Sequence, residues 1–199
     1  MWIQRLRTAV RFASVTLGLS LASGMAIDGL TVSDALAIGI GERLPAYMLT
    51  DLGGRSHDLS AQKGSVLLIH IFGHSAQVCY QSAPRLETNF HQKYNTRGLR
   101  VYGVESWSGT QSEVEDFRTT TDVTYPLLLG GAAFASECDL SYNSFLLVDS
   151  AGIVRYVSPG PAESAFDEST LSQRTETYLD QVATADLRTW GAIKTLYNR

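Results

Sequence analysis

The chain has 199 residues, of which 44% are hydrophobic and 18% are charged, and its formal net charge is -4. This length and composition predict one globular domain, since single domains usually hold about 100–200 residues. The acidic balance and the lack of clustered Lys and Arg exclude a nucleic-acid-binding protein, which needs a basic patch to contact phosphates.

The N-terminus has the pattern of an export segment. Basic residues precede an uncharged apolar run over residues 12–27, which is shorter than the ~20 residues of a membrane-spanning helix. These basic residues are Arg5, Arg7 and Arg11. We expect residues 1–37 to be a signal peptide, cleaved after Ala26 or after Ala37, or a retained anchor that attaches the protein to a membrane through residues 5–27. Both alternatives predict an exported domain, periplasmic or lumenal, or held on the non-cytoplasmic side of a membrane.

The sequence of the first half of the domain predicts a β-hairpin followed by a β-α-β unit. The turn at residues 51–54, Asp-Leu-Gly-Gly, lies between two extended runs and indicates the hairpin. Residues 65–72 form a nearly continuous apolar run, typical of a central strand that is buried on both faces. Apolar residues at helical spacing predict a helix over residues 77–97 that ends at Gly98, and residues 99–105 predict a parallel strand.

The second half of the domain predicts shorter elements. We expect a helix over residues 111–120, an extended piece over residues 125–129 and a helical turn over residues 132–138. Residues 143–157 predict a terminal antiparallel hairpin, and residues 168–185 predict the last helix.

Cysteine chemistry is the most specific feature of the sequence. Cys79 falls at the start of the predicted helix, where unpaired N–H groups and the helix dipole favour a thiolate. His74 lies in the loop before this helix and, when protonated, would lower the pKa of Cys79. One alternative is that Cys138 acts as a resolving thiol for Cys79 or forms a disulfide with it. A bond between the two cysteines would close a loop of about 60 residues and stabilise the fold by about 4 kcal/mol. The other alternative is that both cysteines fill the core.

Short motifs in a fixed order give the chain a family resemblance from residue 38 to residue 185. They are Gly41, Pro45, the turn at 51–54, Leu59-Ser60, Lys63-Gly64, Cys79 with Pro84, Tyr125-Pro126, and Phe145-Leu146-Leu147-Val148-Asp149 with Gly152. In this order the chain resembles the thioredoxin-like redoxins, which include TlpA/ResA-type thiol-disulfide proteins and the alkyl hydroperoxide reductase/peroxiredoxin family. The resemblance implies an α/β thioredoxin-like fold with a central mixed sheet flanked by helices.

At the redox centre, several residues of this chain differ from the motifs of the families that it resembles. In the W-C-x-x-C motif of the thiol-disulfide proteins, Cys79 matches the second cysteine, and Ala76 stands where the attacking cysteine belongs. In the P-x-x-x-T-x-x-C motif of peroxiredoxins, Phe72 and Ala76 replace the proline and the threonine. Asn143 stands where a peroxiredoxin has its activating arginine and where a thioredoxin has its cis-proline.

Two classes of function follow. The family implies an exported thiol-based oxidoreductase or peroxiredoxin-type antioxidant that works through Cys79 on protein thiols and disulfides or on peroxide. The replacements at Ala76 and Asn143 favour a redox-inactive thioredoxin-fold module that binds a protein through its active-site face. We expect no cofactor and no metal ion, because the loop holds one cysteine and residues 139–142 contain no histidine.

The expected organisation has three parts. Residues 1–37 are the signal or anchor, residues 38–185 are the redoxin domain, and residues 186–199 form an amphipathic C-terminal tail. Apolar residues at helical spacing in this tail would dock on the domain itself, on a partner or on a membrane face.

Overall fold

A computed structural model describes residues 37–197 except residues 61, 63, 159 and 163–164. The predicted signal or anchor segment therefore lies outside the described residues, apart from its last residue. Among the described residues, no helix combines the length and the apolar character needed to cross a membrane.

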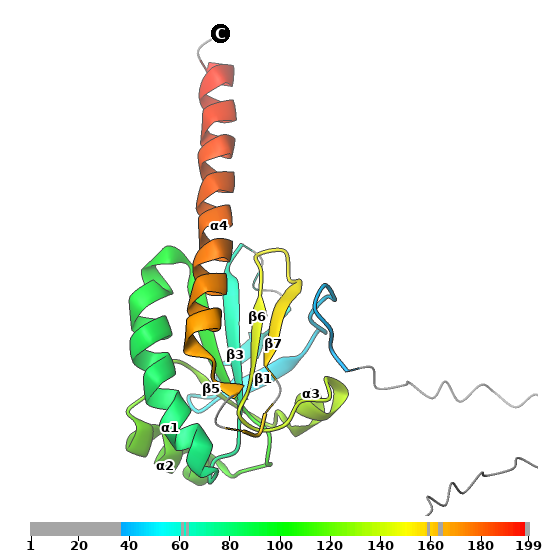
Figure 1. Ribbon diagram of the computed structural model, residues 1–199, viewed down its shortest axis with the longest axis vertical. Coiled ribbons are helices and arrows are strands. Elements are labelled where there is room, and N and C mark those ends of the chain that lie inside the picture. The colour runs from blue at the N-terminus through cyan, green and yellow to red at the C-terminus, as the bar shows by residue number, and fades with distance from the viewer. Residues whose placement is uncertain (1–36, 61, 63, 159, 163–164, 198–199) are drawn as a thin grey trace, which may run out of the picture. The chain divides into compact units, whose positions relative to one another are not determined.

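A seven-stranded mixed sheet forms the centre of the domain (Figure 1), in the order β2-β1-β5-β4-β3-β6-β7. Its strands are β1 (Met48–Asp51), β2 (Ser56–Asp58), β3 (Val66–Phe72), β4 (Leu99–Glu105), β5 (Leu127–Leu129), β6 (Ser144–Val148) and β7 (Val154–Ser158). β3 pairs in parallel with β4 and antiparallel with β6. The predicted central strand, the hairpin at 51–54 and the terminal hairpin are thus confirmed.

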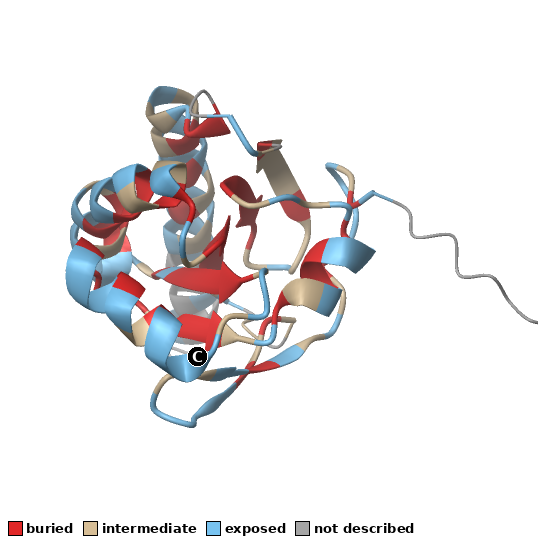
Figure 2. Cartoon of the chain, turned by 90° about the horizontal axis from the view of Figure 1, so that it is seen from below, coloured by how far each residue is buried: buried red, intermediate tan, exposed pale blue. Residues whose placement is uncertain are grey.

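Two apolar cores lie on the two faces of the sheet, because side chains alternate along each strand. On β3, Leu68 and Phe72 belong to one core, whereas Leu67, Ile69 and Ile71 belong to the other. The first core also takes side chains from the helices α1 (Gln77–Leu86), α2 (Gln111–Thr121) and α4 (Glu168–Tyr197). The second core takes side chains from α3 (Ala132–Glu137) and from the segment before β1. Buried residues accordingly follow the strands and the inner sides of the helices in Figure 2.

The predicted helix over residues 77–97 is less regular than the sequence indicates. α1 ends at Leu86 and continues as π-helical turns, η1 (Glu87–Gln92), and then a 3-10 turn, η2 (Asn95–Arg97), before Gly98 with φ 97°. Pro84 inside α1 has no N–H to donate to the preceding turn.

The first residue of these π-helical turns is tied to a distant loop. The carboxylate of Glu87, which is only 4% exposed, accepts hydrogen bonds from the Thr124 N–H (2.8 Å), the Thr124 hydroxyl (2.7 Å) and the Gln92 amide (3.0 Å). Burial raises the pKa of Glu87, but these hydrogen bonds together hold the pKa below its usual value.

The last helix is longer than predicted, since α4 continues without a break from Glu168 to Tyr197. Its first half packs on the sheet and runs beside α1, η1 and η2, with ion pairs that repeat at helical spacing. These pairs are Arg85–Glu168 (2.8 Å), Lys93–Glu176 (3.6 Å) and Arg97–Asp180 (2.8 Å). Every side chain described after Val182 is exposed, and in Figure 1 this part of α4 extends beyond the sheet. The predicted tail is therefore a continuation of α4.

Replacement of Glu87 by Gln should lower the free energy of unfolding by about 1–3 kcal/mol near neutral pH, because buried donors lose a charged acceptor. The folded-state pKa of Glu87 is lowered, so its contribution is complete above the unfolded-state pKa and is lost as the pH falls through the folded-state pKa. Urea unfolding at about pH 7 and about pH 3 should therefore show a difference between wild type and Glu87→Gln that shrinks in acid.

Glu115→Gln is the matched control, since Glu115 forms an exposed ion pair with Arg118. Its effect should stay below about 1 kcal/mol. Equal losses of unfolding free energy in the two variants would contradict this account of Glu87. So would a loss in Glu87→Gln that does not depend on pH.

Candidate functional site

The sheet brings several loops to one edge. β3 and β4 end together there, with Phe72 opposite Glu105. β6 starts at the same edge with Ser144, and β7 ends there with Ser158. We call the connections at this edge, with the helix starts that follow them, the loop edge; it comprises residues 73–79, 105–116, 130–143, 160–162 and 165–167.

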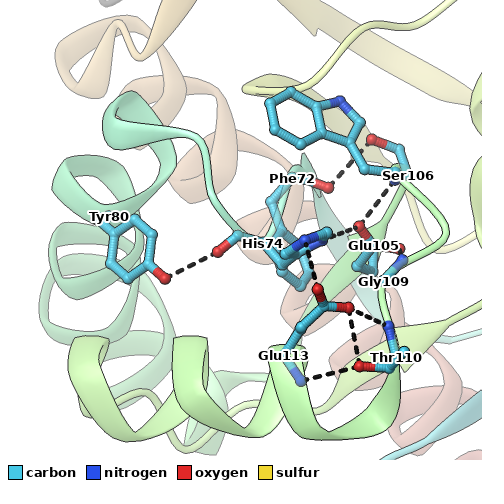
Figure 3. A network of polar contacts seen from close by, with 9 residues as sticks. Phe72, His74, Tyr80, Glu105, Ser106, Gly109, Thr110 and Glu113 are labelled. Carbon is cyan, nitrogen blue, oxygen red and sulfur yellow. Dashed lines mark hydrogen bonds and ion pairs between the residues drawn. The ribbon is translucent and has the colours of Figure 1, made fainter.

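The loop between β3 and α1 is well ordered by hydrogen bonds. Ala76 is the residue before α1, and its N–H donates to the Gly73 carbonyl (3.0 Å), while the Cys79 N–H donates to the Ala76 carbonyl (2.9 Å). The Tyr80 hydroxyl donates to the His74 carbonyl (2.8 Å) and ties the loop to α1, as Figure 3 shows. The sequence prediction that Cys79 lies in the first turn of a helix is confirmed.

The Cys79 thiol is buried, with no exposed surface. Burial raises its pKa to about 11, although backbone hydrogen bonds from Gly73 and Asn143 oppose this rise. At neutral pH, Cys79 is therefore a protonated thiol shielded from solvent. Thiol-disulfide exchange requires an accessible thiolate, which this arrangement does not provide.

A fully buried carboxylate, Glu105, organises the loops beside Cys79. One oxygen of Glu105 accepts hydrogen bonds from the Trp107 N–H (2.8 Å) and lies 3.1 Å from Nδ1 of His74, and the other accepts from the Gly109 N–H (2.9 Å). Nε2 of His74 lies 3.7 Å from Glu113. As Figure 3 shows, the His74 ring is directed at these two carboxylates. The hydrogen bonds that lower the pKa of Cys79 come instead from the backbone of Gly73 and Asn143.

Trp107 is the large apolar side chain that the loop edge exposes, at 43% of its surface. Its indole packs directly on Gly73, where a Cβ would come within 2.6 Å of the ring. The ring centroid lies 4.8 Å from that of Tyr142 in an edge-to-face contact. The ring is therefore held by Gly73 and Tyr142 and exposed on the remaining surface.

Asn143 and His70 are buried polar residues on the side of the sheet that holds Cys79. Asn143 adopts φ 60° and donates its amide to the Ala162 carbonyl (3.0 Å), while its Oδ1 makes no hydrogen bond of standard geometry among the described residues. Neither ring nitrogen of His70 makes a hydrogen bond of standard geometry among the described residues, but the Asn143 side chain lies close enough to favour the charged ring. The ring stacks on Phe145 with centroids 4.8 Å apart. Burial lowers the pKa of His70 to about 3, so its ring is neutral at physiological pH.

Cys138 is not brought near Cys79. It follows the last residue of α3 and belongs to the second core, whereas Cys79 belongs to the first core on the other face of the sheet. Both cysteines are free, and burial raises the pKa of Cys138 to about 12. In the part of the chain that the structure describes, no group of three or more His, Cys, Asp and Glu could hold a metal ion.

The sequence singled out Cys79, His74, Ala76 and Asn143, and the structure gathers these four at one edge of the sheet. The sequence patterns did not single out Glu105 or Trp107. The signal for Glu105 was its position as a charged residue at the end of a predicted buried strand. A buried charge requires hydrogen-bonding partners.

Comparisons with known proteins agree with this fold. The Redoxin family model matches residues 40–174. The thiol-disulfide oxidoreductase ResA of Geobacillus kaustophilus is 25% identical over 116 residues, which make up 58% of this chain and 66% of that protein. The matched region thus spans just under two thirds of the length of that relative.

Solved structures show the same architecture. A candidate protein disulfide isomerase from Bacteroides thetaiotaomicron has a TM-score of 0.64 and 24% identity, covering 72% of this chain and 91% of that one. A secreted disulfide oxidoreductase of Mycobacterium tuberculosis, homologous to DsbE of E. coli, has a TM-score of 0.56 and 16% identity, covering 66% of this chain and 96% of that one. The fold is thioredoxin-like, and because the family model covers well over half of the chain, the protein belongs to the Redoxin family.

Proposed function

We propose that this protein is an exported redoxin-fold module that binds polypeptides at its loop edge and lacks a dithiol cycle of its own. One observation carries the proposal: the position before α1 is Ala76, while the cysteine of this helix, Cys79, is fully buried with its pKa raised to about 11. A dithiol cycle needs an accessible attacking thiolate and a second thiol to resolve the mixed disulfide.

Polypeptides are the partner class that the relatives support. ResA is named as a thiol-disulfide oxidoreductase, and a solved structural relative is a candidate protein disulfide isomerase. The loop edge keeps a well-ordered loop before α1 and an exposed, fixed Trp107. We infer that binding of a protein through this edge has been kept while exchange chemistry has been lost.

A second candidate function is single-thiol chemistry at Cys79. The backbone hydrogen bonds from Gly73 and Asn143 would stabilise a Cys79 thiolate if a partner opened the loop edge. Both protein disulfides and peroxide would require this opening, since the thiol has no exposed surface.

Export rests on the N-terminal pattern of basic residues followed by an apolar run. The secreted character of the Mycobacterium tuberculosis relative agrees with it. Release by a signal peptidase and retention as a membrane anchor are the two alternatives, and they differ in the mass of the mature protein.

Cys79 should resist modification in the folded protein. With its pKa near 11, only about 0.1% of the thiol is ionised at about pH 8, and burial blocks access to that fraction. In a Cys138→Ala background, reaction with a water-soluble aromatic disulfide reagent should be at least about 100-fold slower in the folded protein than in urea. Rapid reaction of folded protein, or its oxidation by dilute peroxide, would instead support the single-thiol function.

Ala76→Cys should restore a dithiol centre, because the strand end, the start of α1 and the hydrogen bonds of the loop are all present. The variant should form a disulfide with Cys79 and gain insulin reductase activity in the presence of a dithiol reductant. Ala76→Cys/Cys79→Ser is the matched control, since it keeps the new thiol and removes its partner. Failure of the disulfide to form in oxidised Ala76→Cys would mean that this loop has departed from redoxin geometry.

A further inference from the structure

The loop edge has a one-sided charge. It contains seven acidic residues, and none of the 16 Lys and Arg residues of the chain falls within it. The acidic residues are Glu105, Glu113, Glu115, Asp116, Glu137, Asp139 and Asp167. The single ionisable residue of opposite sign in this set of segments is His74.

Two basic side chains lie next to the loop edge but neutralise only part of its charge. Arg85 lies over the Phe166 ring and is already paired with Glu168. Glu115 pairs with Arg118, and the His74 ring is shared by Glu105 and Glu113. Among the described residues, no Lys or Arg pairs with the four others, which are Asp116, Glu137, Asp139 and Asp167. All four are exposed. A patch of one sign attracts partners of the opposite sign and speeds their association.

An aromatic anchor lies within this acidic edge. Trp107 exposes 43% of its surface, while Gly73, Tyr142 and the Glu105 carboxylate fix its ring and its backbone. A fixed aromatic side chain loses little conformational entropy when it binds. Its ring accepts an apolar side chain by burial, or an ammonium or guanidinium group by cation–π attraction.

We infer that the loop edge recognises polypeptide segments that carry Lys or Arg next to an apolar residue. The apolar residue packs on Trp107, and the basic residues face the acidic side chains of the loop edge. This inference rests on the proposed function, since it assumes that polypeptides bind at this edge, and it adds the charge and the apolar character of the segment. An acidic segment would instead meet like charges on three of the segments of the edge, which are residues 105–116, 130–143 and 165–167.

The test uses three labelled peptides of about 12 residues, identical except that the positions flanking a central leucine are Lys, Gln or Glu. We expect the Lys peptide to bind at least about tenfold more tightly than the Glu peptide at about 50 mM salt, as followed by fluorescence anisotropy. Raising the salt to about 300 mM should reduce this ratio to about threefold or less, because screening weakens exposed charge pairs.

Three substitutions remove charge from the edge while preserving backbone roles. Glu113→Gln keeps the capping box with Thr110, because Gln also serves at this position. Asp167→Asn keeps the side-chain oxygen that accepts from the Thr170 N–H at the start of α4. Asp139→Asn suits its φ of 52°, since Asn tolerates the left-handed region. The triple variant should bind the Lys peptide about three- to tenfold more weakly than wild type and the Gln peptide almost unchanged.

A matched pair of single variants locates the effect. Asp139 and Asp122 are both exposed and both adopt left-handed backbone, with φ 52° and φ 54°, but Asp122 follows the far end of α2. Asp139→Asn should weaken binding of the Lys peptide about two- to threefold, whereas Asp122→Asn should leave it unchanged. Trp107→Ala should weaken all three peptides, by about tenfold, because it removes the shared apolar contact.

Each outcome decides a separate point. If the three peptides bind equally and Trp107→Ala weakens them all, the charge inference is overturned and the proposed polypeptide-binding function stands. If folded protein binds none of them, the proposed function is overturned together with the inference. Equal effects of Asp139→Asn and Asp122→Asn would overturn the assignment to the loop edge. Loss of peptide binding as the protein concentration rises would assign the edge to a second copy of the chain instead.

Discussion

A buried negative charge at the end of β4 sets the geometry of the loops around the candidate site. A carboxylate without solvent must be surrounded by donors, since an isolated charge in the protein interior is very costly. Glu105 meets this requirement with the N–H groups of Trp107 and Gly109 and with the ring of His74. One side chain therefore fixes the loop after β4 and the loop after β3 relative to each other.

Burial keeps the Cys79 thiol protonated, although its position at the start of a helix favours a thiolate. A helix N-terminus typically contributes about 0.3–1 kcal/mol to a charged group, which is less than one pKa unit. Burial of the thiol moves its pKa from 9.0 to about 11, a larger effect in the opposite direction. Sequence position predicts the helix start and its dipole, but it carries no information on how completely the neighbouring loops cover the sulfur.

The architecture could be predicted because its signals are local and repeated. The apolar run of β3 and the turn residues of both hairpins each indicate the observed element, and the spacing of apolar residues over 77–97 indicates the helical segment that starts with α1. The contact between Glu87 and Thr124 was not predictable, because the two residues are distant in the sequence. Glu105 was missed for the same reason, since its donors come from two loops that meet only in the folded chain.

The direction of α4 gives the molecule two opposite ends. The helix starts just after residue 167 of the loop edge and runs along one face of the sheet to the opposite edge, where its last turns extend beyond the sheet in Figure 1. Its 30 residues correspond to about 45 Å along the helix axis. A partner or surface attached at the C-terminal end would leave the loop edge facing away from the attachment, free to approach a second molecule. In this way α4 can act as a spacer that sets both the reach and the orientation of the loop edge.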